Sequence, residues 1–228
     1  EHIWTDTDRS RSGLLKFAFF PDVSFNHYVQ YALDVPMYFI IRNHDYIDMT
    51  SMTFRQFLER GHNGERATIE DWNDHLTTLF PETRIKRYIE VRSADSQPPE
   101  LMPALPAVIK GVFYDSDCLQ AAWDLVKGWS WDERMQVYLD SHRDALAARI
   151  RRYSLLDLAK ELFQIAWEGL RRQKALNSQG DDETIYLNPL KTLLFQGKCP
   201  ADVLVEKWEG ELQQDIKKLI AYSAYKLP

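Results

Sequence analysis

A proline-rich stretch, SADSQPPELMP at 93–103, divides the chain into two parts with different residue patterns. Proline has no backbone N–H and fixes φ, so three prolines in one short segment end any regular element that reaches it. Before this stretch, aromatic and β-branched runs alternate with short capped helices. After it, apolar residues recur at three- and four-residue spacing. This order predicts an α+β fold, with a sheet-forming part at 1–100 and a helical part at 101–228 that pack as one continuous domain.

Four runs in the first part predict β-strands. LLKFAFF at 14–20 and MYFIIR at 37–42 are rich in aromatic and β-branched residues. HDYIDMT follows the second run across a turn near Asn43 and His44, as a hairpin partner would. RIKRYIEVR at 84–92 alternates in polarity, and we expect a single strand there.

Helix starts are marked by capping residues. Ser24, Thr53 and Thr68 precede helical patterns in the first part, and Ser130 opens a capping box with Glu133 in the second. The strongest pattern is SLLDLAKELFQIAWEGLRRQK at 154–174. Its predicted buried face consists of Leu155, Leu158, Leu162, Ile165, Ala166 and Gly169. Shorter helices are expected around 181–195, 200–208 and 212–222.

Composition excludes several classes of function. A net charge of -6 argues against general nucleic-acid binding, which needs a positive surface. No apolar run is long enough to span a bilayer. The two cysteines, Cys118 and Cys199, are too few for a secreted disulfide scaffold and indicate a reducing compartment, the cytoplasm. The start at Glu1 suggests that a further segment precedes the chain.

The strand at 84–92 carries an unusual concentration of charge on one face. Alternate side chains of a strand share a face, and here that face carries Arg84, Lys86, Tyr88, Glu90 and Arg92. A solvated sheet face is one interpretation. The other is an active-site floor, because Glu90 and Arg92 have Cβ atoms roughly 7 Å apart, a spacing at which a carboxylate and a guanidinium can hold a metal and its phosphate.

Other candidate sites are weaker. Asp6, Asp8 and Ser10 alternate like the start of a calcium loop, but the loop's glycine and final glutamate are missing. Arg9 and Arg11 leave open a polar loop near an anionic ligand. The histidines show no zinc spacing, and His75 is expected to be structural. The basic segment RIRRYS at 149–154 is expected to be solvated surface.

The chain resembles glutamate–cysteine ligase of the plant and proteobacterial type. The similar segments occur in the family's order and are HIWTDTDRSRSG, YALDVPMYF, TFRQFLERG, DWNDHLTTLFPETRIKRYIEVRSAD, ALPA, AAWDLV and TIYLNPL. The resemblance runs from about residue 2 to the C-terminus. It implies a glutamine-synthetase-like fold, in which antiparallel strands form a half-barrel with ATP, Mg²⁺ and L-glutamate on its polar concave face. It also implies ATP-dependent joining of the glutamate γ-carboxylate to the amine of L-cysteine.

The resemblance assigns roles to five residues of this sequence. Glu90 would be a magnesium ligand, and Arg92 a catalytic residue that contacts phosphate or substrate. Lys86 would be a second catalytic cation. Tyr31 would belong to the cysteine pocket, and Arg11 would contact an anionic substrate group.

The sequence also departs from the family pattern. The acidic motifs that supply most metal ligands lie N-terminal to the matched region in the family and are absent here. Ser93 stands where a glycine is expected, and Met49 and Pro103 stand where the plant enzymes have regulatory cysteines. Two hypotheses follow. The chain is the C-terminal part of a ligase, acting with the N-terminal part or by self-association, or it is a truncated relative that binds a nucleotide or a partner without catalysis.

Overall fold

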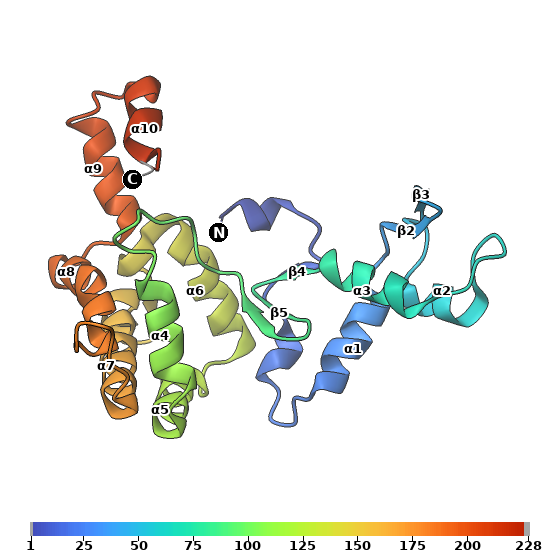
Figure 1. Cartoon of the computed structure of the whole chain (residues 1–228), viewed down its shortest axis with the longest axis horizontal. Coiled ribbons are helices and arrows are strands. Elements are labelled where there is room, and N and C mark those ends of the chain that lie inside the picture. Colours follow the sequence, from blue (N-terminus) through green and yellow to red (C-terminus); the bar gives the residue numbers. More distant parts are fainter. Residues whose placement is uncertain (1, 226–228) are drawn as a thin grey trace. The chain divides into compact units, whose positions relative to one another are not determined.

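The structure is a computed structural model that describes residues 2–225 and divides into two compact units, Glu1–Ala94 and Asp95–Pro228 (Figure 1). The mixed α+β class is confirmed. Among the described residues each sheet has two strands, namely β1–β4, β2–β3, β5–β6 and β7–β8. The division falls inside the proline-rich stretch, and the packing of the two parts as one continuous domain stays a prediction.

The first unit combines short strands with three α-helices. In chain order its elements are η1 (His2–Asp6), β1 (Ser12–Gly13), η2 (Lys16–Phe19), α1 (Phe25–Asp34), β2 (Phe39–Arg42), β3 (Asp45–Asp48), α2 (Phe54–Arg60), α3 (Ile69–Thr77), β4 (Phe80–Pro81), β5 (Thr83–Ile85) and β6 (Ile89–Val91).

The predicted hairpin after residue 37 is confirmed. β2 and β3 are antiparallel, and Ile40 pairs with Ile47. The turn residues Asn43 and His44 have φ of 50° and 71°. Two consecutive left-handed residues make the turn whose twist matches that of the flanking strands.

The expectation of a strand at 14–20 is wrong, since this segment contains the 3₁₀ helix η2. Its backbone bonds are local: Ala18 N–H donates to the Leu15 carbonyl, and Phe20 N–H donates to that of Phe17. Leu15 and Phe17 pack against a cluster that includes Tyr28 of α1. A short apolar run fits a strand or a buried turn equally well, and contact with α1 decides between them.

Helices α1, α2 and α3 begin directly after the predicted capping residues. The side chains of Thr53 and Thr68 accept bonds from the N–H groups of Gln56 and Asp71, and Ser24 caps α1. Gly61 ends α2 with a φ of 71°, in the left-handed region that glycine tolerates.

The expectation of one strand over 84–92 is also wrong, because β5 and β6 form an antiparallel hairpin. Arg84 lies opposite Glu90, and Ile85 lies opposite Ile89. The turn is centred on Arg87, so each even-numbered residue of β5 lies opposite an even-numbered residue of β6. Even-numbered side chains therefore stay on one face and odd-numbered side chains on the other when the chain reverses. The separation into a charged and an apolar face therefore survives, while Lys86 and Tyr88 move into the turn.

Two apolar clusters hold the first unit together. One surrounds Phe57 and Met37 and the other surrounds Ala32 and Leu79; all four side chains are fully buried. His75, on α3, is buried, and its Nε2 lies 2.7 Å from the Ala32 carbonyl oxygen. Its predicted structural role is confirmed.

The second unit is helical. Its elements are α4 (Ala104–Phe113), α5 (Ser116–Val126), α6 (Trp131–Asp144), η3 (Ala145–Ala147), β7 (Arg149–Ile150), β8 (Tyr153–Ser154), α7 (Leu155–Gln173), η4 (Glu183–Leu187), α8 (Asn188–Gln196), α9 (Pro200–Glu209) and α10 (Ile216–Ser223). The predicted helices of this part are confirmed, and the arginines of the 149–154 segment are exposed as expected. Within residues 2–225, no helix combines the length and apolarity that crossing a bilayer requires.

Helices α4 and α7 cross closely, side by side in Figure 1. A Cβ added at Gly111 would overlap the Ala166 backbone, and one at Gly169 would overlap the Gly111 carbonyl. The predicted buried face of α7 is confirmed in part. Ala166 and Gly169 are buried as expected, together with Phe163 and Leu170, while Leu162 is exposed. Proximity to α4 selects this face, since only small residues permit such a close approach.

Candidate functional site

The charged face of the β5–β6 hairpin is partly covered. Arg84 is 8% exposed, while Ile89 on the opposite face is 59% exposed. The usual arrangement of a half-buried strand, with its apolar side inward, is therefore reversed in this chain. The charged face lies toward the interior of the unit, where ion pairs are less screened by water.

Glu90 sits between two arginines. Arg84 Nε donates to Glu90 Oε2 at 2.9 Å, and Arg92 Nη1 donates to Oε1 at 2.9 Å. Burial by itself raises the pKa of Glu90, but the hydrogen bonds and charges of Arg84 and Arg92 outweigh burial and lower it. With two guanidinium groups and one carboxylate, the cluster Arg84–Glu90–Arg92 keeps an excess of positive charge.

Arg84 anchors this cluster to the rest of the unit. Its Nη1 donates to the carbonyl oxygens of Thr77, at 2.8 Å, and Leu79, at 3.0 Å. Thr77 is the last residue of α3 and Leu79 directly precedes β4, so Arg84 fixes the hairpin against the segment that joins these two elements. Its donors are used within the protein, which makes it a structural residue.

Arg92 retains a donor for a ligand. Its Cζ lies 5.4 Å from the centre of the Phe80 ring, and its side chain is 20% exposed. Its Nε is buried and has no hydrogen-bond partner in the part of the chain that the structure describes. An unpaired buried N–H is costly, and an anion that binds beside Arg92 would relieve that cost.

Helix α1 places Tyr28 near this cluster and Tyr31 against Tyr28. The Tyr28 and Tyr31 rings meet edge to face, with centroids 5.7 Å apart. Burial is the main reason that the pKa of each phenol is raised; for Tyr28, the charges of Arg84 and Arg92 act in the opposite direction. The Tyr31 hydroxyl is buried without a hydrogen-bond partner among the described residues. The assignment of Tyr31 to the cysteine pocket stays a prediction.

The structure places Arg11 in the interior. It is 2% exposed, and its Cζ stacks 3.7 Å from the centre of the Tyr38 ring. Its Nε donates to Asp8 at 2.8 Å and its Nη2 to the Pro36 carbonyl at 2.7 Å. The hydrogen bond from Arg11 is the largest cause that lowers the pKa of Asp8 to about 2. These contacts tie the N-terminal loop to the core, and the role of Arg11 as an anion contact stays a prediction.

Lys86 lies in the β5–β6 turn and is half-buried. It takes no part in the ion pairs that the structure gives to Glu90. Sequence reasoning placed Lys86 with Glu90 and Arg92 on a continuous strand, and it gave no role to Arg84 or Tyr28. The sequence could have pointed to Arg84, because Arg84 and Glu90 are separated by an even number of positions. This spacing places both side chains on one face whether or not the chain turns between them.

Residues 2–225 do not fit a magnesium site on their own. Both Glu90 oxygens accept from guanidinium groups, and the described part of the chain has no group of three or more His, Cys, Asp or Glu side chains arranged to hold a metal. Mg²⁺ takes several oxygen ligands in octahedral geometry. Any such ion at Glu90 needs carboxylates from outside these residues.

Comparison with known proteins gives one family. The profile of "Glutamate-cysteine ligase family 2 (GCS2)" matches residues 1–218. The chain is 42% identical to the chloroplastic glutamate–cysteine ligase of Brassica juncea over 94% of this chain and 41% of that protein. It is 40% identical to ligase A of Oryza sativa subsp. indica over 94% and 43% of the two chains. The chloroplastic enzyme of Solanum lycopersicum is 38% identical, over 98% and 42%. The chain thus spans about two fifths of the length of these relatives.

Proposed function

The chain belongs to glutamate–cysteine ligase family 2, and from this membership we propose that it is the C-terminal part of an ATP-dependent ligase. The enzyme would join the γ-carboxylate of L-glutamate to the amine of L-cysteine, the first step of glutathione synthesis. The names of the relatives motivate the reaction. The observation that supports a role for this chain is the buried, unpaired Nε of Arg92 beside Glu90.

The proposed chemistry has two steps. A γ-carboxylate oxygen of glutamate attacks the γ-phosphorus of ATP, which releases ADP and forms an acyl phosphate. The cysteine amine then attacks the acyl carbon, loses a proton and displaces phosphate. Negative charge builds up on phosphoryl and carboxylate oxygens in both steps, and fixed cationic donors stabilise it.

Arg92 is suited to meet that charge. Glu90 holds the guanidinium through Nη1, and the Arg92 Cζ lies over the Phe80 ring, 5.4 Å from its centre. The remaining donors are thereby oriented before a ligand arrives, and this lowers the entropy that binding must overcome. Lys86, from the adjacent turn, would be the second catalytic cation, and Arg11 would act near the anionic substrate groups.

Mg²⁺ would supply charge neutralisation on the nucleotide phosphates. Glu90 as one of its ligands is the proposal that follows from the family motif, with the remaining carboxylates provided by the rest of the enzyme. In the present structure Glu90 instead orients Arg92. The two roles differ in their consequences for the Mg²⁺ dependence of the enzyme.

The sheets of the first unit support the proposal of a longer enzyme. Each has two strands, and the apolar face of β5–β6 exposes Ile89 and Val91. Further strands would complete a half-barrel and cover such surface. The N-terminal part of the enzyme is the proposed source, and self-association of the chain is the alternative source.

The second candidate function is a binding module without catalysis. It is favoured by the absence of a metal-binding group in residues 2–225. Such a module would still bind nucleotide phosphate at Arg92, but it would not form ADP in the presence of its partner part.

A chimera tests the proposal. Residues 1–218 would replace the matching segment of the Brassica juncea enzyme, and ADP release would be measured with MgATP, L-glutamate and a panel of amines. We expect cysteine-dependent ADP release from the chimera and little from the 228-residue chain alone, because its described residues offer only Glu90 as a proposed metal ligand. A folded but inactive chimera beside an active parent would favour the module.

Arg92→Lys supplies the site-specific arm of this experiment, with Arg87→Lys as its matched control in the exposed turn. A single ammonium cannot replace a planar guanidinium group held in a fixed orientation. Arg92→Lys should therefore lower turnover of the chimera by about a hundredfold. Arg87→Lys should leave it unchanged.

The proposed compartment is the cytoplasm, and the names of the relatives give the chloroplast for those proteins. Cys118 and Cys199 are both free thiols. Free thiols are compatible with either reducing compartment.

A further inference from the structure

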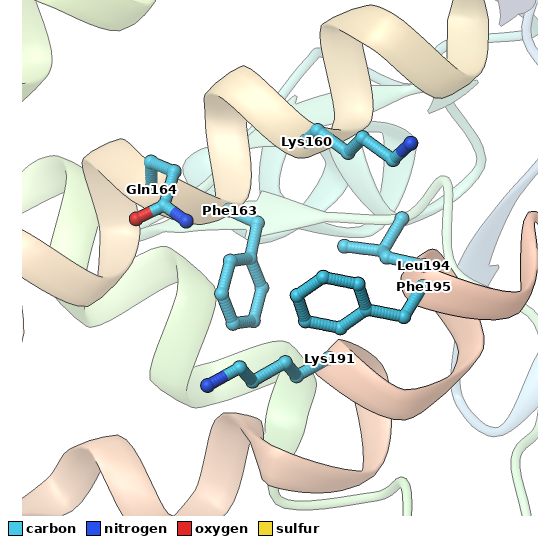
Figure 2. A pocket seen from close by; sticks show the side chains of 6 residues that line it. All are labelled: Lys160, Phe163, Gln164, Lys191, Leu194 and Phe195. Atoms are coloured by element: carbon cyan, nitrogen blue, oxygen red, sulfur yellow. The ribbon is translucent and has the colours of Figure 1, made fainter.

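A shallow groove between α7 and α8 lies in the second unit, whereas Arg92 and Glu90 belong to the first. Its volume is about 130 Å³. Figure 2 shows its lining, which consists of Lys160, Phe163, Gln164, Lys191, Leu194 and Phe195. Nothing in the proposed ligase reaction uses these residues.

The floor of the groove is apolar. Phe163 and Leu194 are buried, at 5% and 7% exposure, and Phe195 forms a wall that is 79% exposed. In Figure 2 the Phe163 and Phe195 rings lie next to each other between the two helices. An apolar cavity of about 150 Å³ accepts a benzene molecule. The groove therefore has room for one ring-sized apolar group.

The rim of the groove is cationic. The Lys191 Nζ lies 5.1 Å from the Trp167 ring centre and 6.0 Å from that of Phe195, so two aromatic faces hold its ammonium in place. In Figure 2 the Gln164 amide lies above the Phe163 ring and the Lys191 ammonium lies below it, while the Lys160 ammonium lies farther away, near Leu194. No carboxylate is among the lining residues. In the described part of the chain neither lysine forms an ion pair, although Lys160 contributes to lowering the pKa of Asp157.

We propose that this groove binds a small organic anion made of one ring-sized apolar group and a carboxylate. The ring lies against Phe163, Leu194 and Phe195, and the carboxylate lies at the Lys191 ammonium. A positive rim on a chain of net charge -6 supplies the charge complementarity. The occupant is a small molecule because neighbouring positions on the two helices, such as Glu161, Thr192 and Gln196, are exposed and polar, which limits the apolar contact to one group.

The probe for the test is 4-phenylbutyrate, titrated into the 228-residue chain and followed by amide NMR shifts. We expect saturable shifts confined to residues 160–167 of α7 and 191–196 of α8, with a dissociation constant in the millimolar range. The alcohol 4-phenylbutan-1-ol lacks the carboxylate and should bind about fivefold more weakly. Butyrate lacks the ring and should give no saturable shift.

Variants locate the binding. Lys191→Gln should weaken phenylbutyrate binding about fivefold, and Phe195→Ala about tenfold. The matched controls are Lys217→Gln on α10 and Phe113→Ala at the end of α4, both exposed and outside the groove. Both controls should bind the probe as the parent chain does.

Three outcomes would overturn the proposal. The first is the absence of saturable shifts in the groove. The second is equal affinity for the alcohol and the acid, with no effect of Lys191→Gln. The third is much tighter binding of an acetylated Asp-Phe-Glu peptide at the same residues, since this would assign the groove to a protein segment instead of a small acid.

Discussion

Arg84 and Glu90 lie directly opposite each other in the β5–β6 hairpin, and the Arg84 Nε donates to Glu90 Oε2 at 2.9 Å. The same carboxylate holds Arg92 through its other oxygen. Arg84 in turn binds the carbonyls of Thr77 and Leu79. The pair therefore connects the stability of the hairpin to the orientation of the proposed catalytic arginine.

Arg84→Lys should lower the free energy of unfolding by about 2 kcal/mol, because one ammonium cannot serve Glu90 and two carbonyls from a buried position. Urea denaturation of the 228-residue chain measures this change. Arg87→Lys is the control, since Arg87 lies in the exposed turn, and it should change stability by less than about 0.5 kcal/mol. Equal stability of the two variants would show that Arg84 does not anchor the hairpin.

Glu90→Gln should raise the Mg²⁺ concentration needed for half-maximal ADP release by about tenfold in the chimeric enzyme, because Gln keeps the shape of a ligand and loses its charge. Glu59→Gln, at the exposed end of α2, is the matched control and should be neutral.

Two other results for Glu90→Gln are informative. A lower rate with unchanged Mg²⁺ dependence would assign Glu90 to holding Arg92 alone. Behaviour identical to that of Glu59→Gln would reduce the charged face to solvated surface.

Acid should destabilise the first unit below about pH 4. The pKa of Asp8 is lowered from 3.8 to about 2, first by its hydrogen bond from Arg11, and those of Glu90 and Asp71 are lowered in spite of burial by their arginine partners. A carboxyl whose folded pKa is depressed stabilises the fold above its unfolded pKa and loses that contribution as pH falls through the folded value.

Thermal unfolding followed from pH 6 down to about pH 2 measures this loss. Asp8→Asn removes one of the three groups and should make the decline with pH shallower. A melting temperature that stays constant over this range would contradict the assignment of these ion pairs.

Gly169→Ala should destabilise the second unit by about 3 kcal/mol, because the new methyl group would overlap the Gly111 carbonyl and push α4 and α7 apart. Gly128→Ala is the control: its φ is not left-handed, and its nearest neighbour is the Arg151 guanidinium at 3.8 Å. Denaturation followed by circular dichroism compares the two. Similar midpoints would mean that the helices accommodate the methyl group.

Reductant should change neither the electrophoretic mobility nor the activity of the protein. Cys118 is 4% exposed, and burial raises the pKa of both Cys118 and Cys199, which leaves the thiols protonated and slow to react. Alkylation with iodoacetamide followed by mass spectrometry measures their reactivity. A native Cys118–Cys199 disulfide in that experiment would refute the expectation.

Features that depend on neighbouring residues were predictable from sequence. Thr53, Thr68, Ser130 and Ser154 cap their helices because each side chain reaches an N–H three residues ahead. The turn at Asn43 and His44 was predictable for the same reason, because it depends only on neighbouring residues. The family was recognisable because its motifs are contiguous in the chain, and the profile match confirms it.

Features that depend on contacts between distant residues were decided only by the tertiary structure. The alternation at 84–92 is the same for one strand and for a hairpin centred on Arg87, so pairing with Glu90 had to be seen in space. The burial of Arg11, whose guanidinium donates to Pro36 and Thr78, could not be derived from its position in a polar loop, because both partners are distant in the chain. The buried face of α7 is chosen by Gly111 of α4, across more than fifty residues of chain, because side-chain patterns specify an amphipathic helix but not which neighbour it meets.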